Sequence, residues 1–300
     1  MRHLFPLLIC CLLAPRLGAQ SATDSLWQRV RAAEVDTSRI NALQALAKEL
    51  ARGELDSALV ISRQSLALAE AIDWAPGQAE AWYQMGRIQA LRNELDSARQ
   101  CYQRSLPLAE ATGKQHLVAD NCYYEGNVLT NQDRYEDGLA LYEQALAIYR
   151  ELKDELTIMR LSINMSWVLS EMGQYPEAAE KLYEAIELAE KHEVPRSIFN
   201  ARHELGYVFM QMGKLDEARE IFEANEAMAP TLGDPYKKSV AYGDLGLYYA
   251  ELGDYEKALS YDLKDLGVQE EMGETKDLPL IYNNIGANYL ALERYEQAIQ

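Results

Sequence analysis

Apolar residues recur along this 300-residue chain at steps of three and four, on both sides of short polar turns, which is the pattern of paired amphipathic α-helices. The stretch GDYEKALSY at residues 253–261 has an alanine at its centre, and related stretches return every 40 residues. Their central residues are Ala58, Ala98, Gly138, Ala178, Ala218, Ala258 and Ala298. Because a fixed period of this size is typical of stacked supersecondary units, it predicts about seven helix–turn–helix hairpins.

A second series of mostly small residues lies 12 positions before the first. It comprises Leu46, Gly86, Gly126, Ser166, Gly206, Gly246 and Gly286. Glycine inside a helix lowers helix stability by about 1 kcal/mol relative to alanine, so its recurrence at this position requires a compensating gain from packing. We expect the first helix to present Gly206 to Ala218 of the second helix, with no side chain between the two backbones. An aromatic residue or leucine in each turn would then close the end of the hairpin.

The turns between paired helices carry residues that tolerate a left-handed backbone. These are Gly53, Asn93, Asp133, Gly173, Gly213 and Gly253. Pro176 falls in the first turn of a second helix, where its missing N–H costs nothing. The run Asp36, Thr37 and Ser38 suits the N-cap of the first repeat.

The chain start has the features of a secretory signal peptide. Arg2 and His3 precede an apolar run at residues 4–14, which is too short to span a bilayer, and a cleavage site follows Ala19. The predicted organisation is a signal peptide at 1–19, a cap segment at 20–38 and a repeat region at 39–300. The repeats are 39–78, 79–118, 119–158, 159–198, 199–238, 239–278 and an incomplete 279–300. We therefore expect an exported protein, periplasmic or extracellular, and a natural chain that continues past Gln300.

The net charge of the chain restricts the classes of partner that it could bind. The formal net charge is −18, whereas a nucleic-acid-binding surface needs a basic stripe. The same charge argues against direct binding of residues 20–300 to an anionic membrane. The acid excess fits either a solvated helix-rich surface or a groove selective for basic or amphipathic segments. After cleavage two cysteines remain, Cys101 and Cys122, either as buried small residues or as a disulfide pair.

The pattern resembles the tetratricopeptide repeat (TPR) family. Matching residues include Trp82, Gly86, Ala98 and Tyr102 in one unit, and Leu205, Gly206, Phe209, Ala218 and Phe222 in another. The usual period of that family is 34 residues, so this chain is more similar to a long-repeat branch with a 40-residue period. The resemblance implies an all-α fold, a right-handed α-solenoid or superhelix of about seven hairpins, with first helices lining a concave surface.

A row of aromatic, arginine and asparagine residues is expected on one exposed face of the first helices, and the same helical spacing places Asp244 on this row. The expected peptide-binding residues are Tyr83, Arg87, Tyr123, Tyr124, Asn127, Arg160, Asn164, Trp167, His203 and Tyr207. Aromatic and arginine side chains concentrate binding energy, and asparagine can donate to and accept from peptide groups. The alternative is that the tyrosine and tryptophan side chains pack on the next repeat and the asparagine side chains cap turns. The family's carboxylate clamp is not expected, because the corresponding positions hold Tyr83, Arg87, Tyr124 and Asn164 without a lysine.

Catalytic and metal-binding patterns are missing from the sequence. His116, His192 and His203 fall in different repeats, with no nucleophile motif, phosphate-binding loop or histidine pair at metal spacing. We therefore expect no enzyme activity and no cofactor, and a scaffold that binds a protein or peptide on its concave face. The alternative is the N-terminal sensory region of a longer bacterial signalling protein with a kinase or DNA-binding domain. The oligomeric state stays open.

Overall fold

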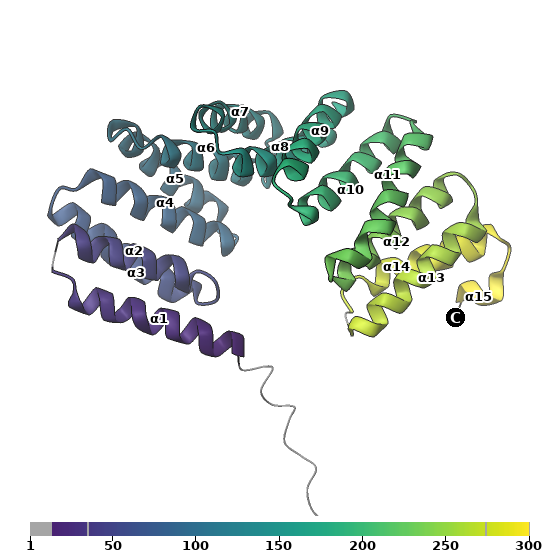
Figure 1. Cartoon of the computed structure of the whole chain (residues 1–300), viewed down its shortest axis with the longest axis horizontal. Coiled ribbons are helices and arrows are strands. Elements are labelled where there is room, and N and C mark those ends of the chain that lie inside the picture. The colour runs from purple at the N-terminus through teal and green to yellow at the C-terminus, as the bar shows by residue number, and fades with distance from the viewer. Residues whose placement is uncertain (1–13, 35, 274, 300) are drawn as a thin grey trace, which may run out of the picture. The chain divides into compact units, whose positions relative to one another are not determined.

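The computed structural model describes residues 14–34, 36–273 and 275–299, and every regular element in these ranges is helical. The fold is an all-α solenoid of helical hairpins (Figure 1). The chain divides into two compact units, Met1–Lys153 (unit 1) and Asp154–Gln300 (unit 2). Residues 1–13 of the predicted signal peptide lie outside the described residues.

Unit 1 consists of a leading helix and three hairpins. Its helices are α1 (Ala14–Ala32), α2 (Thr37–Leu50), α3 (Leu55–Ala71), α4 (Ala75–Leu91), α5 (Leu95–Ala111), α6 (Gln115–Thr130) and α7 (Tyr135–Leu152). Consecutive helices pack against each other, and the first helices α2, α4 and α6 also touch in sequence. Asp36 caps α2 by accepting a 2.7 Å hydrogen bond from the Ser38 backbone N–H, which confirms the predicted N-cap.

Unit 2 continues the same arrangement. Its helices are α8 (Glu155–Glu171), α9 (Tyr175–Lys191), α10 (Pro195–Gln211), α11 (Leu215–Met228), the 3₁₀ helix η1 (Ala229–Leu232), α12 (Pro235–Glu251), α13 (Tyr255–Met272), α14 (Leu278–Ala291) and α15 (Tyr295–Ile299). The first helices α8, α10 and α12 contact their neighbours in that order. Because first helices approach one another in both units, their shared face is continuous within each unit.

A left-handed turn residue occurs every 20 positions from 73 to 293. The backbone φ is positive at all twelve of these positions, as predicted for Asn93, Asp133, Gly173, Gly213 and Gly253. The prediction is wrong for Gly53, which follows α2 in a turn without positive φ. The turns between hairpins use the same conformation, although several of their residues are not glycine. These are Asp73, Lys153 and Glu193.

Three of the repeated glycines, Gly86, Gly126 and Gly206, face a ring on the partner helix. A Cβ on Gly206 would lie 2.2 Å from Cε1 of Phe222, and one on Gly86 would lie 2.7 Å from Cε1 of Tyr102. The expected contact with the small residue also exists, since a Cβ on Gly126 would lie 3.2 Å from the Gly138 carbonyl oxygen. The expectation that no side chain lies between the backbones is therefore wrong for these three glycines, each of which makes room for a ring on the partner helix, and for Gly246, which faces the Asp262 carboxylate.

The core lies between the helices of each hairpin and between neighbouring hairpins. The largest fully buried side chains are Tyr102, Tyr142 and Tyr149 in unit 1 and Phe199 and Phe222 in unit 2. Cys101 and Cys122 are both buried and are not bonded to each other. Burial raises the pKa of each thiol to about 11, so both behave as small apolar residues. None of the described helices combines the length and hydrophobicity that crossing a membrane requires.

Candidate functional site

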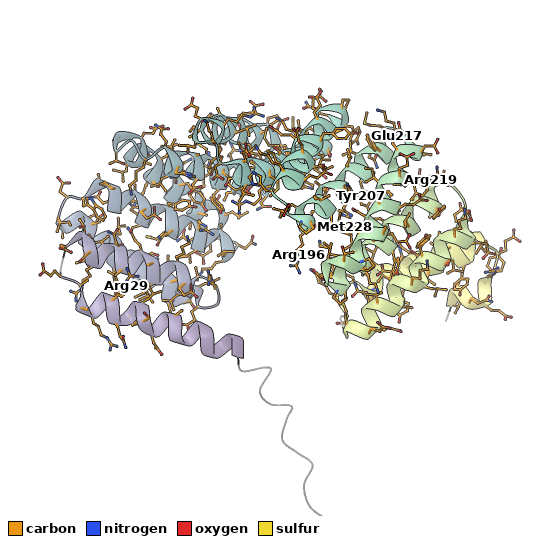
Figure 2. All side chains as sticks on the ribbon, viewed as in Figure 1. Arg29, Arg196, Tyr207, Glu217, Arg219 and Met228 are labelled. Carbon is orange, nitrogen blue, oxygen red and sulfur yellow. The ribbon has the colours of Figure 1, made fainter. Side chains whose placement is uncertain are left out.

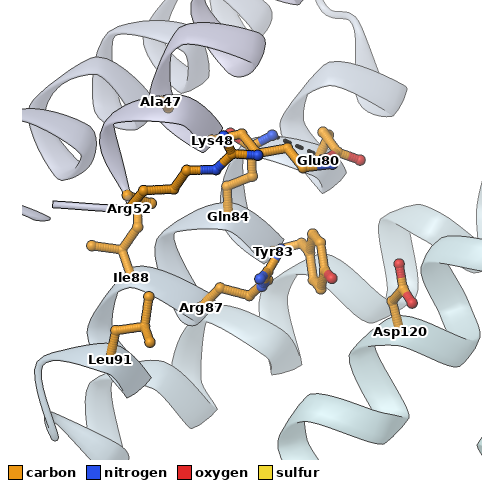
Figure 3. Close-up of a pocket in the computed structure, with 11 residues that line it drawn as sticks. Ala47, Lys48, Arg52, Glu80, Tyr83, Gln84, Arg87, Ile88, Leu91 and Asp120 are labelled. Carbon is orange, nitrogen blue, oxygen red and sulfur yellow. Dashed lines mark hydrogen bonds between the residues drawn. The ribbon is translucent and has the colours of Figure 1, made fainter. Parts of the chain in front are cut away.

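Helix α4 builds one wall of a pocket in unit 1, and α2 and α6 supply the others. The pocket has a volume of about 350 Å³ (Figure 3). Its lining residues are Ala47, Lys48, Ala51, Arg52, Glu80, Tyr83, Gln84, Arg87, Ile88, Leu91 and Asp120. The α4 residues recur at steps of three and four, so one helical face points into the space. Three basic and two acidic side chains make this pocket polar as well as aromatic.

Arg87 is the central charge of the unit 1 pocket. Its guanidinium carbon lies 4.9 Å from the ring centroid of Tyr124 and 5.9 Å from that of Tyr83. No hydrogen bond or ion pair connects Arg87 to another residue within the described part of the chain. Burial works to lower the pKa of Arg87, but the neighbouring tyrosines and Asp120 raise it overall. The pocket thus holds a half-buried guanidinium that lies beside two tyrosine rings and interacts with Asp120 through its charge but forms no ion pair with it.

Tyr83 is more enclosed than its predicted role requires. It is only 6% exposed, so the expectation that it lies on an open face is wrong. The reason is packing: its ring centroid lies 6.3 Å from that of Tyr102 and 5.8 Å from that of Tyr124. Burial also raises the pKa of Tyr83 far above the ordinary tyrosine value, so its hydroxyl stays protonated. Tyr83 is therefore a buried lining residue of the pocket, and its ring lies beside the Arg87 guanidinium.

Helix α6 carries three more of the predicted residues. The ring centroids of Tyr123 and Tyr124 lie 5.0 Å apart, and Tyr124 completes the aromatic surface beside Arg87. Asn127 plays a different role, because its Oδ1 accepts a 2.6 Å hydrogen bond from the Tyr142 hydroxyl. That bond occupies the asparagine oxygen inside its own hairpin, so this oxygen already has a partner within the repeat.

Unit 2 has a pocket of about 330 Å³ between α8 and α10, with one residue from α9. Its lining residues are Trp167, Ser170, Glu171, Tyr175, His203, Glu204, Tyr207, Val208 and Gln211. Trp167 is 39% exposed at the rim, and Tyr207 is labelled on α10 in Figure 2. Three of the predicted residues, Trp167, His203 and Tyr207, therefore come together in one place.

A buried carboxylate behind this pocket orients two of its residues. Asp244 of α12 is 2% exposed and accepts hydrogen bonds from the Tyr207 hydroxyl at 3.1 Å and from His203 Nδ1 at 2.9 Å. Burial works to lower the pKa of His203, but the hydrogen bond and charge of Asp244 outweigh it and raise that pKa. Asp244 was expected on the exposed row, and this is wrong because it fills the space between α10 and α12.

The remaining predicted residues of unit 2 stand outside this pocket. Arg160 is exposed and donates a 2.9 Å hydrogen bond from Nη2 to Thr157 Oγ1. Asn164 is half-buried, one turn further along α8. Neither residue lines the pocket that Trp167, His203 and Tyr207 share.

Sequence reasoning missed several lining residues. Leu91, Glu171 and Gln211 each lie four positions after a predicted residue, so extending each row by one helical turn would have found them. Lys48 and Arg52 come from the preceding hairpin. No signal in the sequence marks them, because their position depends on how neighbouring hairpins stack.

Comparison with known proteins gives a consistent result. Residues 38–232 match the family model described as a MalT-like TPR region, and residues 239–261 match one described as a tetratricopeptide repeat. A comparison with curated proteins finds no match.

Several solved structures share the fold at low sequence identity. The apo form of the quorum sensor NprR from B. thuringiensis has a TM-score of 0.73 at 14% identity, covering 96% of this chain and 81% of that one. BtubC (BKLC) from P. vanneervenii has a TM-score of 0.66 at 16% identity, covering 73% and 92%. A signal transduction ATPase with a tetratricopeptide repeat sensor, from Pyrococcus horikoshii, has a TM-score of 0.67 at 14% identity, covering 93% and 45%. Identities this low show the fold alone.

Proposed function

The chain belongs to the tetratricopeptide repeat family, as a MalT-like TPR region, and from this premise we propose that it is a non-enzymatic scaffold that binds a peptide segment of a partner on its first helices. A scaffold of this family is generally a protein-binding fold. The binding face is the set of first-helix residues in each unit, and the pocket around Arg87 anchors the ligand in unit 1.

Arg87 is the observation that carries this proposal. A half-buried guanidinium loses hydration, and this loss is normally offset by a carboxylate or by acceptor oxygens. Arg87 lies beside the rings of Tyr83 and Tyr124 and forms no ion pair within the described residues, although Glu80 and Asp120 line the same pocket. A peptide would supply the missing acceptors through its backbone carbonyls or a carboxylate, and its apolar side chains would cover the exposed Leu91.

The test is selection of binders from a displayed library of random peptides, followed by affinity measurements on single peptides. Arg87→Ala should weaken the selected peptides by about tenfold or more, as loss of an interface arginine anchor does. Arg63→Ala, at an exposed arginine of α3 outside the pocket, is the matched control and should change little. A library that yields no binder, or binders indifferent to Arg87→Ala, would contradict the proposal.

A second candidate function is the sensory region of a longer signalling protein. Two neighbours of the same fold support it, one described as a quorum sensor and one as carrying a tetratricopeptide repeat sensor. Reading the gene past codon 300 tests this candidate. A downstream stretch of about 20 apolar residues followed by a kinase or DNA-binding domain would favour it, and a stop within one further helix would remove it.

We also propose export through a signal peptide that is cleaved after Ala19. The basic start and the apolar run of residues 4–14 support this proposal. N-terminal sequencing of the protein from the cell envelope or medium should show a mature chain that begins at Gln20. A cytosolic protein that still begins with Met1 would refute the proposal.

A further inference from the structure

The unit 2 pocket has walls suited to a positively charged group. Trp167, Tyr175 and Tyr207 supply aromatic rings, and Glu171 and Glu204 supply carboxylates. No lysine or arginine lines the pocket. Aromatic faces carry negative potential and attract cations within about 6 Å of the ring centroid, so rings and carboxylates favour the same kind of ligand here.

Glu204 is the group that lacks a partner. It is half-buried on α10, and no hydrogen bond or ion pair joins its carboxylate to another residue in the described ranges. Burial raises the pKa of Glu204, which reports the cost of holding its charge in this place. Asp244 differs, because His203 and Tyr207 both bind its oxygens. His203 is hydrogen-bonded to Asp244 and interacts with Glu204 only through its charge, so the Glu204 carboxylate can still accept a hydrogen bond from a ligand.

The net charge of unit 2 also favours a cationic ligand. Residues 154–300 contain 28 acidic and 13 basic residues, a net charge of −15 out of −18 for the whole chain. Unit 1 is close to neutral by comparison, at −3. A surface with one dominant sign attracts ligands of the opposite sign and speeds their association.

From these observations we propose that the unit 2 pocket binds a lysine or arginine side chain of a peptide, with its cation against the rings of Trp167 and Tyr207 and paired with Glu204. This inference rests on the proposed function and adds the chemistry of one ligand residue. A neutral apolar side chain would leave the Glu204 carboxylate without a partner, whereas a cation satisfies both the carboxylate and the rings. Of the two pockets, the unit 2 pocket selects for positive charge.

The test uses the full chain labelled with ¹⁵N and a defined probe, the pentapeptide acetyl-Ala-Ala-Arg-Ala-Ala-amide. The matched neutral probe has citrulline, which keeps the shape of arginine without its charge. The readout is the indole N–H resonance of Trp167, assigned by its loss in Trp167→Phe. We expect a saturable shift with the arginine peptide, and binding about tenfold weaker or more with the citrulline peptide.

Two carboxylate variants test whether Glu204 is responsible for the preference for the arginine peptide. Glu204→Gln should lower the affinity for the arginine peptide by about tenfold and leave the citrulline peptide unchanged. Glu187→Gln, at an exposed position of α9 outside the pocket, should change neither. Equal affinity for the two peptides, no saturable shift at concentrations on the order of 10 mM, or equal losses in the two variants would overturn the inference. Equal losses would mean general attraction to an acidic surface.

The outcome separates this inference from the broader proposal. If library peptides bind and depend on Arg87, but are not enriched in lysine or arginine and ignore Glu204→Gln, the inference fails and the proposed function stands. If the arginine peptide binds through Glu204 while no library peptide depends on Arg87, the pocket chemistry holds and the Arg87 anchor of the proposed function fails.

Discussion

The substitution Gly206→Ala separates two opposing effects of glycine in these hairpins. Helix propensity alone predicts a gain of about 1 kcal/mol in the free energy of unfolding. The structure predicts a loss, because the new Cβ would lie 2.2 Å from Cε1 and 2.5 Å from Cζ of Phe222. Phe222 is fully buried, and its ring centroid lies 5.7 Å from that of Tyr207 and 6.4 Å from that of Tyr248. The ring therefore has little room to move away.

Overpacking of this kind costs about 1–3 kcal/mol and the propensity gain offsets about 1 kcal/mol, so the net effect should be a loss of up to about 2 kcal/mol. The assay is urea unfolding followed by circular dichroism, with wild type and variants at one pH. Gly267→Ala is the matched control, since Gly267 lies within α13 and a Cβ there would meet nothing within 4 Å. It should stabilise the chain by about 1 kcal/mol.

A second substitution should rescue the first. One period upstream, the positions equivalent to Gly206 and Phe222 hold Ser166 and Leu182, a larger residue opposite a smaller one. Phe222→Leu combined with Gly206→Ala should therefore destabilise by about 1 kcal/mol less than the sum of the two single changes. Additive effects, or a Gly206→Ala variant as stable as Gly267→Ala, would refute the reasoning.

Three further predictions follow from the structure. Burial raises the pKa of Asp262, which is 3% exposed, from its ordinary value of 3.8 to about 6. The folded chain then holds the proton more tightly than the unfolded chain, so stability should fall by on the order of 3 kcal/mol as pH rises from about 4 to about 6. Asp262→Asn should remove that fall, and unfolding curves at pH 4 and pH 7 that keep it would contradict the assignment. Ala218→Leu, at a fully buried site, should cost about 1–3 kcal/mol, whereas Glu187→Leu on the exposed face of α9 should cost little; equal midpoints in urea would count against the packing account. Trp167→Ala combined with Tyr124→Ala should abolish capture of library-selected peptides on a biosensor while the far-ultraviolet circular dichroism stays unchanged, and retained capture would place the site elsewhere.

Much of the fold was predictable because it repeats. The 40-residue spacing of small residues identified the hairpins, and the N-cap at Asp36 and the left-handed turns at Asn93 and Gly213 followed from local chemistry. The left-handed backbone at Lys153 and Glu193 was not predictable, because neither residue type favours it. The need to pass from one hairpin to the next sets that conformation, and no local signal reports it.

The candidate site was predictable in part. Helical spacing placed Trp167, His203 and Tyr207 on one face, and the structure brings them into one pocket. The same rule placed Asp244 on the exposed row, although it is buried and hydrogen-bonded to His203, 41 positions earlier. Spacing gives the face of a helix, but the next hairpin decides which positions on that face stay open.

The most direct test of the central claim is hydrogen–deuterium exchange of the full chain with and without a library-selected peptide. The account predicts slower amide exchange on binding in the first helices, above all in α4 near Tyr83 and Arg87 and in α10 near Glu204. The second helices α5 and α11 should exchange at the same rate in both states. Protection confined to second helices, or unchanged exchange throughout at saturating peptide, would contradict the claim that first helices form the binding face.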